Sequence, residues 1–377
     1  MKNIYFDNAA TTPIDSRVVD AMIPILKENF GNPSSIHSNG RIARSVIEKS
    51  RKQVASFFNS NPSEFFFTSG GTEADNMILR CCVEDLGVTH IITSRLEHHA
   101  VLHTAEELRD AEGVKLSLVN VCSKGIIDLN HLEELLKLGG KTLVSLMHAN
   151  NEIATKLPLK EVGEICKEYD ALFHSDTVQT MGHYSFDFSD LNLHFATCAA
   201  HKFNGPKGIG FLYMRSDAQL KPMITGGAQE RNMRAGTENI YGIVGLAKAL
   251  ELAYDGLEEH QRDIQILKSY MIKRLKEEIP GVSFNGDSES TDSLYTVLNV
   301  CFPNSDVDEM FLYHLDIEGI SVSGGSACSS GSNIGSHVLR GIGTSMERPS
   351  VRFSFGRFNT IAEVDKTVEV LTKIYSK

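Results

Sequence analysis

The sequence has no long apolar run and no excess of basic residues. No stretch of about 18 uncharged apolar residues occurs, so we expect no membrane-spanning helix. Of the 377 residues, 48 are acidic and 37 are basic, which gives a formal net charge of −11. Broad binding to nucleic acid or to an anionic membrane requires a basic face, so we expect neither partner. The first residues also lack the apolar core of a secretory signal peptide.

The sequence has only seven cysteines and no CxxC pair. A disulfide framework or a zinc site requires paired or regularly spaced cysteines, so we expect reduced thiols in a cytoplasmic protein. The remaining composition, 41% hydrophobic and 23% charged, is that of a folded globular chain and excludes disordered and fibrous proteins. At this length the chain is expected to form two or three domains.

Short apolar segments alternate with helical patterns up to about residue 256, which predicts a large α/β domain over 15–256 with a mostly parallel sheet. Beyond it, a long charged helix over 257–279 opens a smaller α+β domain, residues 257–377. The expected strands are 65–67, 90–93, 116–119, 142–147, 171–174, 194–197, 209–214, 293–302 and 351–355. The other expected helices are 41–58, 72–82, 99–111, 130–138, 159–169 and 306–318.

A glycine pair lies in Ser69-Gly70-Gly71-Thr72-Glu73, between an expected strand and an expected helix. The first N–H groups of a helix are unpaired and carry the positive end of its dipole, so this junction could bind a phosphate. Glycine lets the backbone approach a ligand, and Thr72 adds a hydroxyl. The alternative is an ordinary strand-to-helix turn.

Two charged residues follow consecutive apolar strands. Asp176 stands where ligands bind to parallel sheets and could hold a protonated ring nitrogen, or it could simply cap a helix. Lys202 is a candidate for Schiff-base formation because burial activates a lysine amine, although most loop lysines are merely solvated. The glycines after Lys202 do not open a helix as GxGxxG, so a dinucleotide-binding dehydrogenase is excluded.

Histidines and an arginine supply further candidates. His99 and His103 have the i, i+4 spacing of metal ligands, but no third ligand has suitable spacing, so we expect no metal site. We expect at least one histidine of this group, which begins at His98, to contact a ligand ring or to act as an acid–base. Arg352 lies in an apolar strand pattern, where a buried arginine needs an anionic partner such as a carboxylate. An outward-facing arginine on a half-exposed strand is the alternative.

A single cysteine, Cys328, lies in the glycine- and serine-rich stretch 324–332. This composition is typical of a flexible loop, and free exposed thiols are usually avoided on protein surfaces. A reactive thiol that must move explains the pattern better than a linker with an incidental cysteine.

Taken together, these segments resemble the cysteine desulfurases of the NifS/IscS type, in the class V aminotransferase group, nearly from end to end. The resemblance implies a pyridoxal 5'-phosphate (PLP) enzyme of transferase fold type I, with a seven-stranded sheet and residues 1–14 joined to the small domain. The segments that carry it are 5–13, 31–35, 69–76, 149–152, 176–179, 201–202, 226–239, 326–329 and 352–356.

The resemblance also implies roles in cofactor binding. Lys202 would bind PLP covalently and move the α-proton of the substrate. Asp176 would pair with the pyridine nitrogen, Gln179 would hydrogen-bond the ring hydroxyl, and His98 would stack on the ring and take part in catalysis. The phosphate would be bound by Gly71, Thr72, His201 and, from the other subunit of a homodimer, Thr237.

The implied substrate is L-cysteine, whose carboxylate would be bound by Asn151 and Arg352 and whose sulfur would be attacked by Cys328. The products would be L-alanine and a persulfide, passed to an acceptor protein in iron–sulfur cluster assembly or another sulfur transfer. One alternative is a selenocysteine lyase or another class V PLP enzyme. A non-enzymatic sulfur carrier or regulatory binding protein is the other, and the intact Lys202, Asp176 and Cys328 argue against it.

Overall fold

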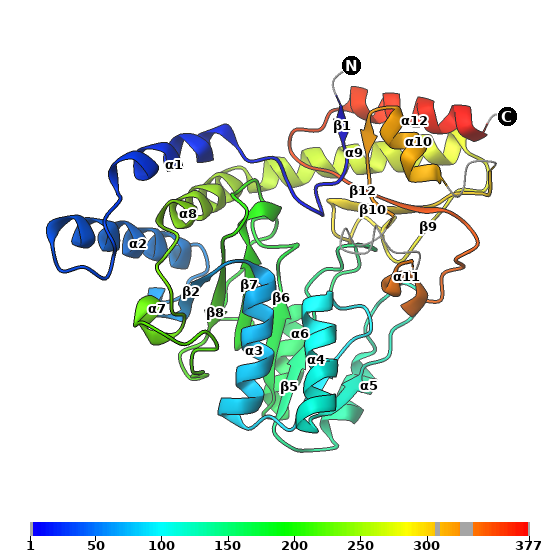
Figure 1. The fold of residues 1–377 in the computed structure, drawn as a ribbon. Coiled ribbons are helices and arrows are strands. Elements are labelled where there is room, and N and C mark those ends of the chain that lie inside the picture. The colour runs from blue at the N-terminus through cyan, green and yellow to red at the C-terminus, as the bar shows by residue number, and fades with distance from the viewer. Residues whose placement is uncertain (1–2, 306–309, 325–334, 376–377) are drawn as a thin grey trace.

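The computed structural model describes residues 3–305, 310–324 and 335–375. The chain forms a larger lobe around a central sheet and a smaller lobe in which both ends of the chain lie (Figure 1). No helix in the described ranges has the length and apolarity needed to span a membrane.

A seven-stranded sheet with the strand order β2-β8-β7-β6-β5-β3-β4 forms the centre of the larger lobe. Only β8 runs antiparallel to its neighbours, β2 and β7, so the prediction of a mostly parallel sheet is confirmed. The strands are β2 (Phe65–Thr68), β3 (His90–Thr93), β4 (Lys115–Leu118), β5 (Thr142–Ser145), β6 (Leu172–Asp176), β7 (Phe195–Ala199) and β8 (Gly210–Met214).

Helices bury both faces of this sheet, which is why its inner strands are buried almost throughout and rich in apolar residues. In β2, Phe65 and Phe67 belong to one core cluster and Phe66 to another, as expected when successive side chains point to opposite faces. One face is covered by α3 (Gly71–Leu86) and α4 (His99–Glu112). The other is covered by α2 (Ser38–Ser56), α5 (Leu129–Leu136), α6 (Leu159–Glu168) and α8 (Ile240–Asp255).

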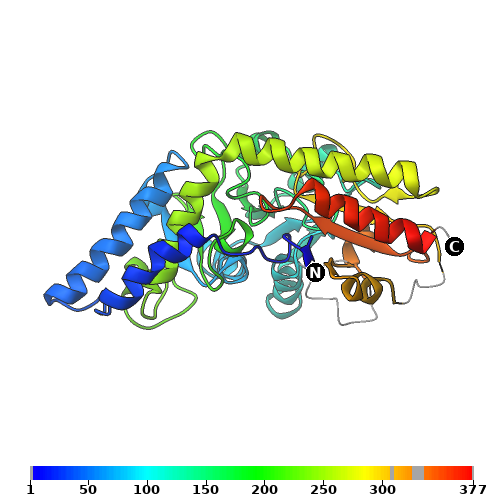
Figure 2. The same cartoon turned by 90° about the horizontal axis from the view of Figure 1, so that it is seen from above.

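Helices α1 (Ser16–Glu28) and α2 extend beyond the sheet on the side of α8 (Figure 2). Both contact α8, which supports them at their inner ends. Their outer surfaces and the turn that joins them expose large apolar side chains, namely those of Val19, Ile23, Leu26, Phe30, Ile36 and Ile42.

The smaller lobe contains a three-stranded antiparallel sheet, ordered β12-β10-β9, packed against two long helices. The N-terminal strand β1 (Ile4–Tyr5) pairs in parallel with β11 (Ile320–Ser321), and Phe6 lies in the core of this lobe. The predicted α+β class is therefore confirmed. Its remaining elements are α9 (Leu257–Glu278), β9 (Ser283–Phe284), β10 (Val297–Cys301), α10 (Phe311–Ile317), α11 (His337–Gly341), β12 (Ser350–Ser354) and α12 (Ile361–Tyr375).

The structure also differs from the sequence-based expectations. Helices α1, α8 and α12 were not among the expected elements, and α8 is buried around most of its circumference, which removes the polar face that reveals a helix. The strand expected over 293–302 is confined to β10, because residue 294 instead donates its N–H to the carbonyl oxygen of Ala154. The domain boundaries at residues 14 and 256 stay a prediction.

A short strained turn at residues 230–232 contacts both α2 and β2. Glu230, Arg231 and Asn232 have left-handed φ angles of 43°, 57° and 66°, which are unfavourable for residues with a side chain. The buried Glu230 carboxylate accepts two hydrogen bonds from Arg51, at 2.7 and 2.8 Å, and one from the Phe67 N–H at 2.8 Å. This ion pair holds the turn in its strained conformation, close to the glycine-containing junction that follows β2.

We expect Glu230→Gln to destabilise the fold by about 3–5 kcal/mol, because it removes the buried counter-charge of the Arg51 guanidinium and leaves only the half-exposed Glu48 carboxylate, 3.3 Å from Nε. The measurement is the midpoint of thermal unfolding. Asp190→Asn is the matched control, since it removes an exposed ion pair with Lys160 and should leave the midpoint unchanged. Equal midpoints for the two variants would contradict a stabilising role of the buried pair.

Candidate functional site

A pocket of about 240 Å³ lies at the carboxyl ends of β5, β6 and β7, beside the first turn of α3. Thr237 lies outside it, in a separate pocket with Thr68 and Ser69, and Cys328 is not among the described residues. The structure thus brings nine of the predicted site residues together: Gly71, Thr72, His98, Asn151, Asp176, Gln179, His201, Lys202 and Arg352.

Lys202 follows β7 at the end of a short 3-10 turn (Ala200–Lys202) and lines the pocket. Its Nζ donates hydrogen bonds to the carbonyl oxygens of Ala9 and Ala10, at 2.6 and 2.9 Å. The interpretation of Lys202 as a solvated loop lysine is therefore wrong. The N-terminal segment forms one wall of the pocket, a contact that the sequence did not predict.

Asp176 is the last residue of β6, so the sheet places its carboxylate at the bottom of the pocket. Oδ1 accepts a hydrogen bond from the Val178 N–H at 2.9 Å, within a turn rather than at the start of a helix, so the helix-cap alternative is wrong. Burial raises the pKa of Asp176 to about 6, and the neighbouring Asp75 contributes to the rise. A cationic partner would stabilise its charged form.

The junction of β2 and α3 has the shape of an anion cradle. Gly70 has a φ of 154°, and a Cβ added to Gly71 would lie 2.6 Å from Cγ2 of Val178. The 16-residue helix α3 begins there and directs its unpaired N–H groups towards the pocket. Nearby, His201 contacts the Thr11 hydroxyl at 3.2 Å through Nδ1, and burial lowers its pKa to about 4.

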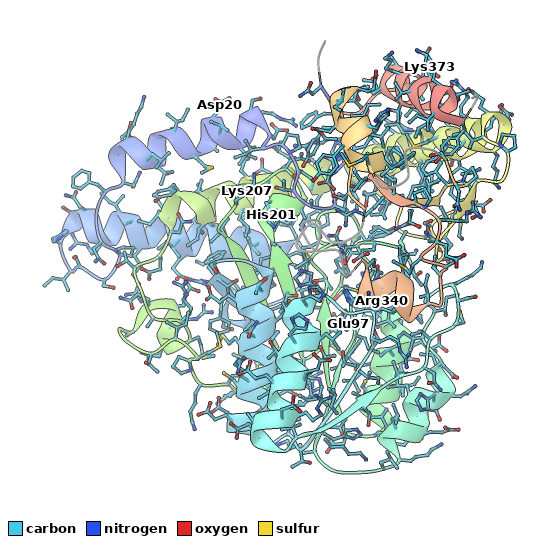
Figure 3. The ribbon with its side chains drawn as sticks, turned by 45° about the vertical axis from the view of Figure 1, so that its right-hand side comes forward. Asp20, Glu97, His201, Lys207, Arg340 and Lys373 are labelled. Atoms are coloured by element: carbon cyan, nitrogen blue, oxygen red, sulfur yellow. The ribbon has the colours of Figure 1, made fainter. Side chains whose placement is uncertain are left out.

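His98 stands at the start of α4, where its Nδ1 accepts a hydrogen bond from the Ala100 N–H at 3.1 Å. Burial lowers the pKa of His98, so its imidazole is neutral near neutral pH. The preceding residue, Glu97, lies beside α11 (Figure 3), and His337 of α11 donates from Nε2 to the Glu97 carbonyl oxygen at 2.9 Å. The loop that carries His98 is therefore fixed from both lobes.

Arg352 lies in β12 of the smaller lobe and is 1% exposed, so the alternative of an outward-facing arginine is wrong. Its guanidinium donates to Asp7 Oδ1 at 2.9 Å and to the Asn151 carbonyl oxygen at 3.0 Å. The predicted carboxylate partner exists and is Asp7. No residue in the described part of the chain accepts a hydrogen bond from the buried Nε atom of Arg352, which leaves a donor for a ligand.

Sequence reasoning missed two polar residues of the site. Asp7 lies in the N-terminal motif but was given no role. Asp75 lies on the buried side of α3 with Gly71, Ile78 and Cys82. A carboxylate on the apolar stripe of a helix is a signal that could have identified it, because buried carboxylates need a partner.

The chain is similar to known proteins over nearly its whole length. A family model described as "Aminotransferase class-V" matches residues 4–367. The chain belongs to this family. The curated protein "Cysteine desulfurase IscS" of Dictyoglomus turgidum is 42% identical over 380 residues, which cover 100% of this chain and 95% of that protein.

Solved structures agree with this assignment. A "NIFS-LIKE PROTEIN" is 38% identical with a TM-score of 0.90, over 99% of both chains. A structure titled "SspA in complex with cysteine" is 31% identical with a TM-score of 0.82, over 95% of this chain and 100% of that one. The chain is a PLP-dependent enzyme of the cysteine desulfurase type, and the resemblance inferred from its motifs is confirmed.

The chemistry of the pocket fits PLP. The cofactor has a basic ring nitrogen, an aldehyde and a phosphate, which require a carboxylate, an amine and an anion cradle respectively. The pocket offers Asp176, Lys202 and the start of α3 for these three groups. The unpartnered Nε of Arg352 remains as a donor for a second anionic group.

We expect Gly71→Ala to weaken PLP binding about tenfold, because the added methyl would collide with the stiff Val178 side chain beside Asp176. The dissociation constant of PLP, measured by fluorescence titration, tests this expectation. The double variant Gly71→Ala/Val178→Ala restores space and should recover most of the affinity. A double variant as weak as the single one would show that the collision is not the cause.

Proposed function

We propose that this pocket removes the sulfur of L-cysteine, giving L-alanine and a persulfide on Cys328 that is passed to an acceptor protein. Iron–sulfur cluster assembly is the proposed destination of the sulfur. One observation carries the proposal: Lys202, Asp176 and Arg352 converge on one pocket of a chain whose relatives are named cysteine desulfurases. They supply an amine, a buried carboxylate and a buried guanidinium with an unused donor.

Bound PLP withdraws electrons from the α-carbon of an attached amino acid, which acidifies the α-proton and loosens the bond from the β-carbon to sulfur. In the proposed arrangement, Asp176 holds the ring nitrogen in its protonated form and Gln179 binds the ring hydroxyl. His98, neutral because of its burial, covers the ring and takes part in proton transfer. The phosphate is bound by Gly71, Thr72 and His201, and by Thr237 of a second subunit.

The substrate carboxylate is proposed to bind Arg352 and Asn151. Arg352 is held by Asp7 and by the Asn151 carbonyl, so its orientation is set before the substrate enters. Its buried Nε supplies a charge-assisted hydrogen bond to the incoming carboxylate. This arrangement favours α-amino acids over amines that lack a carboxylate.

Lys202 is proposed to move the proton at the α-carbon. The carbonyl oxygens of Ala9 and Ala10 accept hydrogen bonds from its ammonium group, so the amine stays within the pocket when it is not bonded to the cofactor. Proton transfer by a positioned amine is effective because the distance and orientation are fixed in advance.

Cys328 is proposed to take the sulfur as a thiolate. A bond forms between the Cys328 sulfur and the substrate sulfur, and the bond from that sulfur to the β-carbon breaks with its electron pair left on carbon. Protonation at carbon completes L-alanine, and the sulfur stays on the enzyme as a persulfide. Atoms and electrons balance without an added oxidant or reductant.

We further propose a homodimer in the cytoplasm. The apolar side chains exposed around α1 and α2 support a large contact with a second copy of the chain, since isolated proteins rarely expose such patches. Six free cysteines among the described residues support a reducing compartment, which a persulfide carrier also needs.

The test of the function is incubation of the holoenzyme with L-cysteine and a reductant, with sulfide and alanine measured together. We expect equal amounts of the two products from the native protein. Cys328→Ala should form less than about one hundredth of the sulfide while its PLP spectrum still changes on adding cysteine. Cys122→Ala, which removes an exposed cysteine, is the matched control and should keep full turnover. Sulfide release undiminished in Cys328→Ala would refute the mechanism.

Lys202→Ala is expected to lose turnover and the visible absorption of lysine-bound PLP, because no other predicted site residue carries an amine. The absorption spectrum of the purified variant with added PLP checks this expectation. Lys207→Ala, five residues further on at an exposed position, should keep both the band and the turnover. A Lys202→Ala protein with the native spectrum would place the covalent attachment elsewhere.

A further inference from the structure

Asp75 of α3 and His174 of β6 face one another beneath the pocket. Asp75 Oδ1 and His174 Nε2 are 3.5 Å apart, and the two side chains are 1% and 0% exposed. Among the described residues, neither of these two atoms has a hydrogen-bond partner. Two buried polar atoms that face only each other are costly unless they share a proton.

The pair of Asp75 and His174 lies next to Asp176. His174 and Asp176 are two residues apart on β6, so their side chains point to the same face of the sheet, towards α3. Asp75 lines the pocket together with Asp176, and the Thr197 hydroxyl donates to Asp176 Oδ1 at 3.4 Å. On the far side, Nδ1 of His174 contacts the Ser145 hydroxyl at 2.8 Å, so the imidazole is held in place.

Two carboxylates so close in an apolar environment cannot both be charged without a large cost. One of them must be neutral for the other to be the counter-ion of a ring nitrogen. Asp176 has the better environment for a charge, because it accepts hydrogen bonds from the Val178 N–H and from Thr197. Asp75 is therefore the carboxyl group expected to carry a proton.

We propose that Asp75 is a positioning residue of the cofactor site: its protonated carboxyl group donates to His174 Nε2 and thereby leaves Asp176 as the only anion beneath the ring. The inference rests on the proposed role of Asp176 in binding the ring nitrogen. It assigns Asp75 and His174 a function for which the sequence motifs gave no indication.

The pKa shifts of Asp75 and His174 agree with this arrangement. Burial raises the pKa of Asp75 to about 7 and lowers the pKa of His174 to about 4. The proton therefore belongs to Asp75, and His174 accepts. The other titratable groups that face this region are His98, Glu97 and Lys202; burial also raises the pKa of Glu97 well above its usual value.

The test is infrared spectroscopy of the holoenzyme in heavy water, where a protonated carboxyl group absorbs apart from carboxylates. We expect a carboxylic-acid band at about pH 6 that weakens towards about pH 9, because a group with a raised pKa loses its proton in that range. Asp75→Asn should remove this band. Glu97→Gln, which removes another buried carboxyl group with a raised pKa, is the matched control and should leave the Asp75 band in place.

Cofactor binding provides a second measurement. Asn is a neutral isostere of protonated Asp, so Asp75→Asn should bind PLP within about threefold of the native protein. Asp176→Asn removes the proposed anion and should weaken PLP binding more than about tenfold. A band unaffected by Asp75→Asn, or PLP loss as severe as in Asp176→Asn, would overturn the proposal.

His174→Gln keeps the test decisive if Asp75→Asn does not fold. Replacing the acceptor should shift the frequency of the Asp75 band, whereas His148→Asn, at a half-buried histidine hydrogen-bonded to Thr180, should not. An unshifted band in His174→Gln would also refute the proposal. Both infrared readouts are independent of cysteine turnover, so a native protein that makes no sulfide would refute the proposed function without deciding this inference.

Discussion

The ends of β5, β6 and β7 meet at one edge of a sheet that helices bury on both faces, and the charged groups placed there must find partners other than water. Lys202 finds backbone carbonyls, Arg352 finds Asp7, and Asp176 finds the N–H of a turn. The partners of Lys202 and Arg352 both come from the N-terminal segment. The arrangement of the N-terminal segment, the smaller lobe and the strand ends around one pocket follows from this requirement.

PLP fits this pocket because its charged groups pair with the charged and polar groups of the pocket. A cationic ring nitrogen would balance Asp176, whose pKa burial has raised, and a phosphate would bind the unpaired N–H groups of α3. The same reasoning explains why the region beneath the ring tolerates a second carboxyl group only when that group is neutral. Burial and cofactor binding together therefore determine which carboxyl groups of the site are charged.

Sequence reasoning predicted the sheet because strands buried on both faces are rich in apolar residues, and it placed Asp176 and Lys202 at the edge of the sheet because Asp176 ends one such strand and Lys202 lies shortly after the next. It could not predict the contact between Asp7 and Arg352, since these residues are 345 positions apart and no local pattern links them. Sequence reasoning did not predict helix α8, because this helix is buried around most of its circumference and has no polar face. Thr237 and Cys328 remain assigned by resemblance alone.

The contact between Asp7 and Arg352 also has a consequence for how the protein is made. The pocket needs carbonyl groups at residues 9 and 10 and a guanidinium at residue 352, so its walls come from segments that are synthesised at widely separated times. A chain still attached to the ribosome at residue 300 has the sheet but not the arginine. The larger lobe must therefore exist for a time with an open site, in which Asp7 has no counter-charge. Any cofactor captured at that stage would be held without the wall that contains Arg352, and its retention would depend on how soon residue 352 is synthesised.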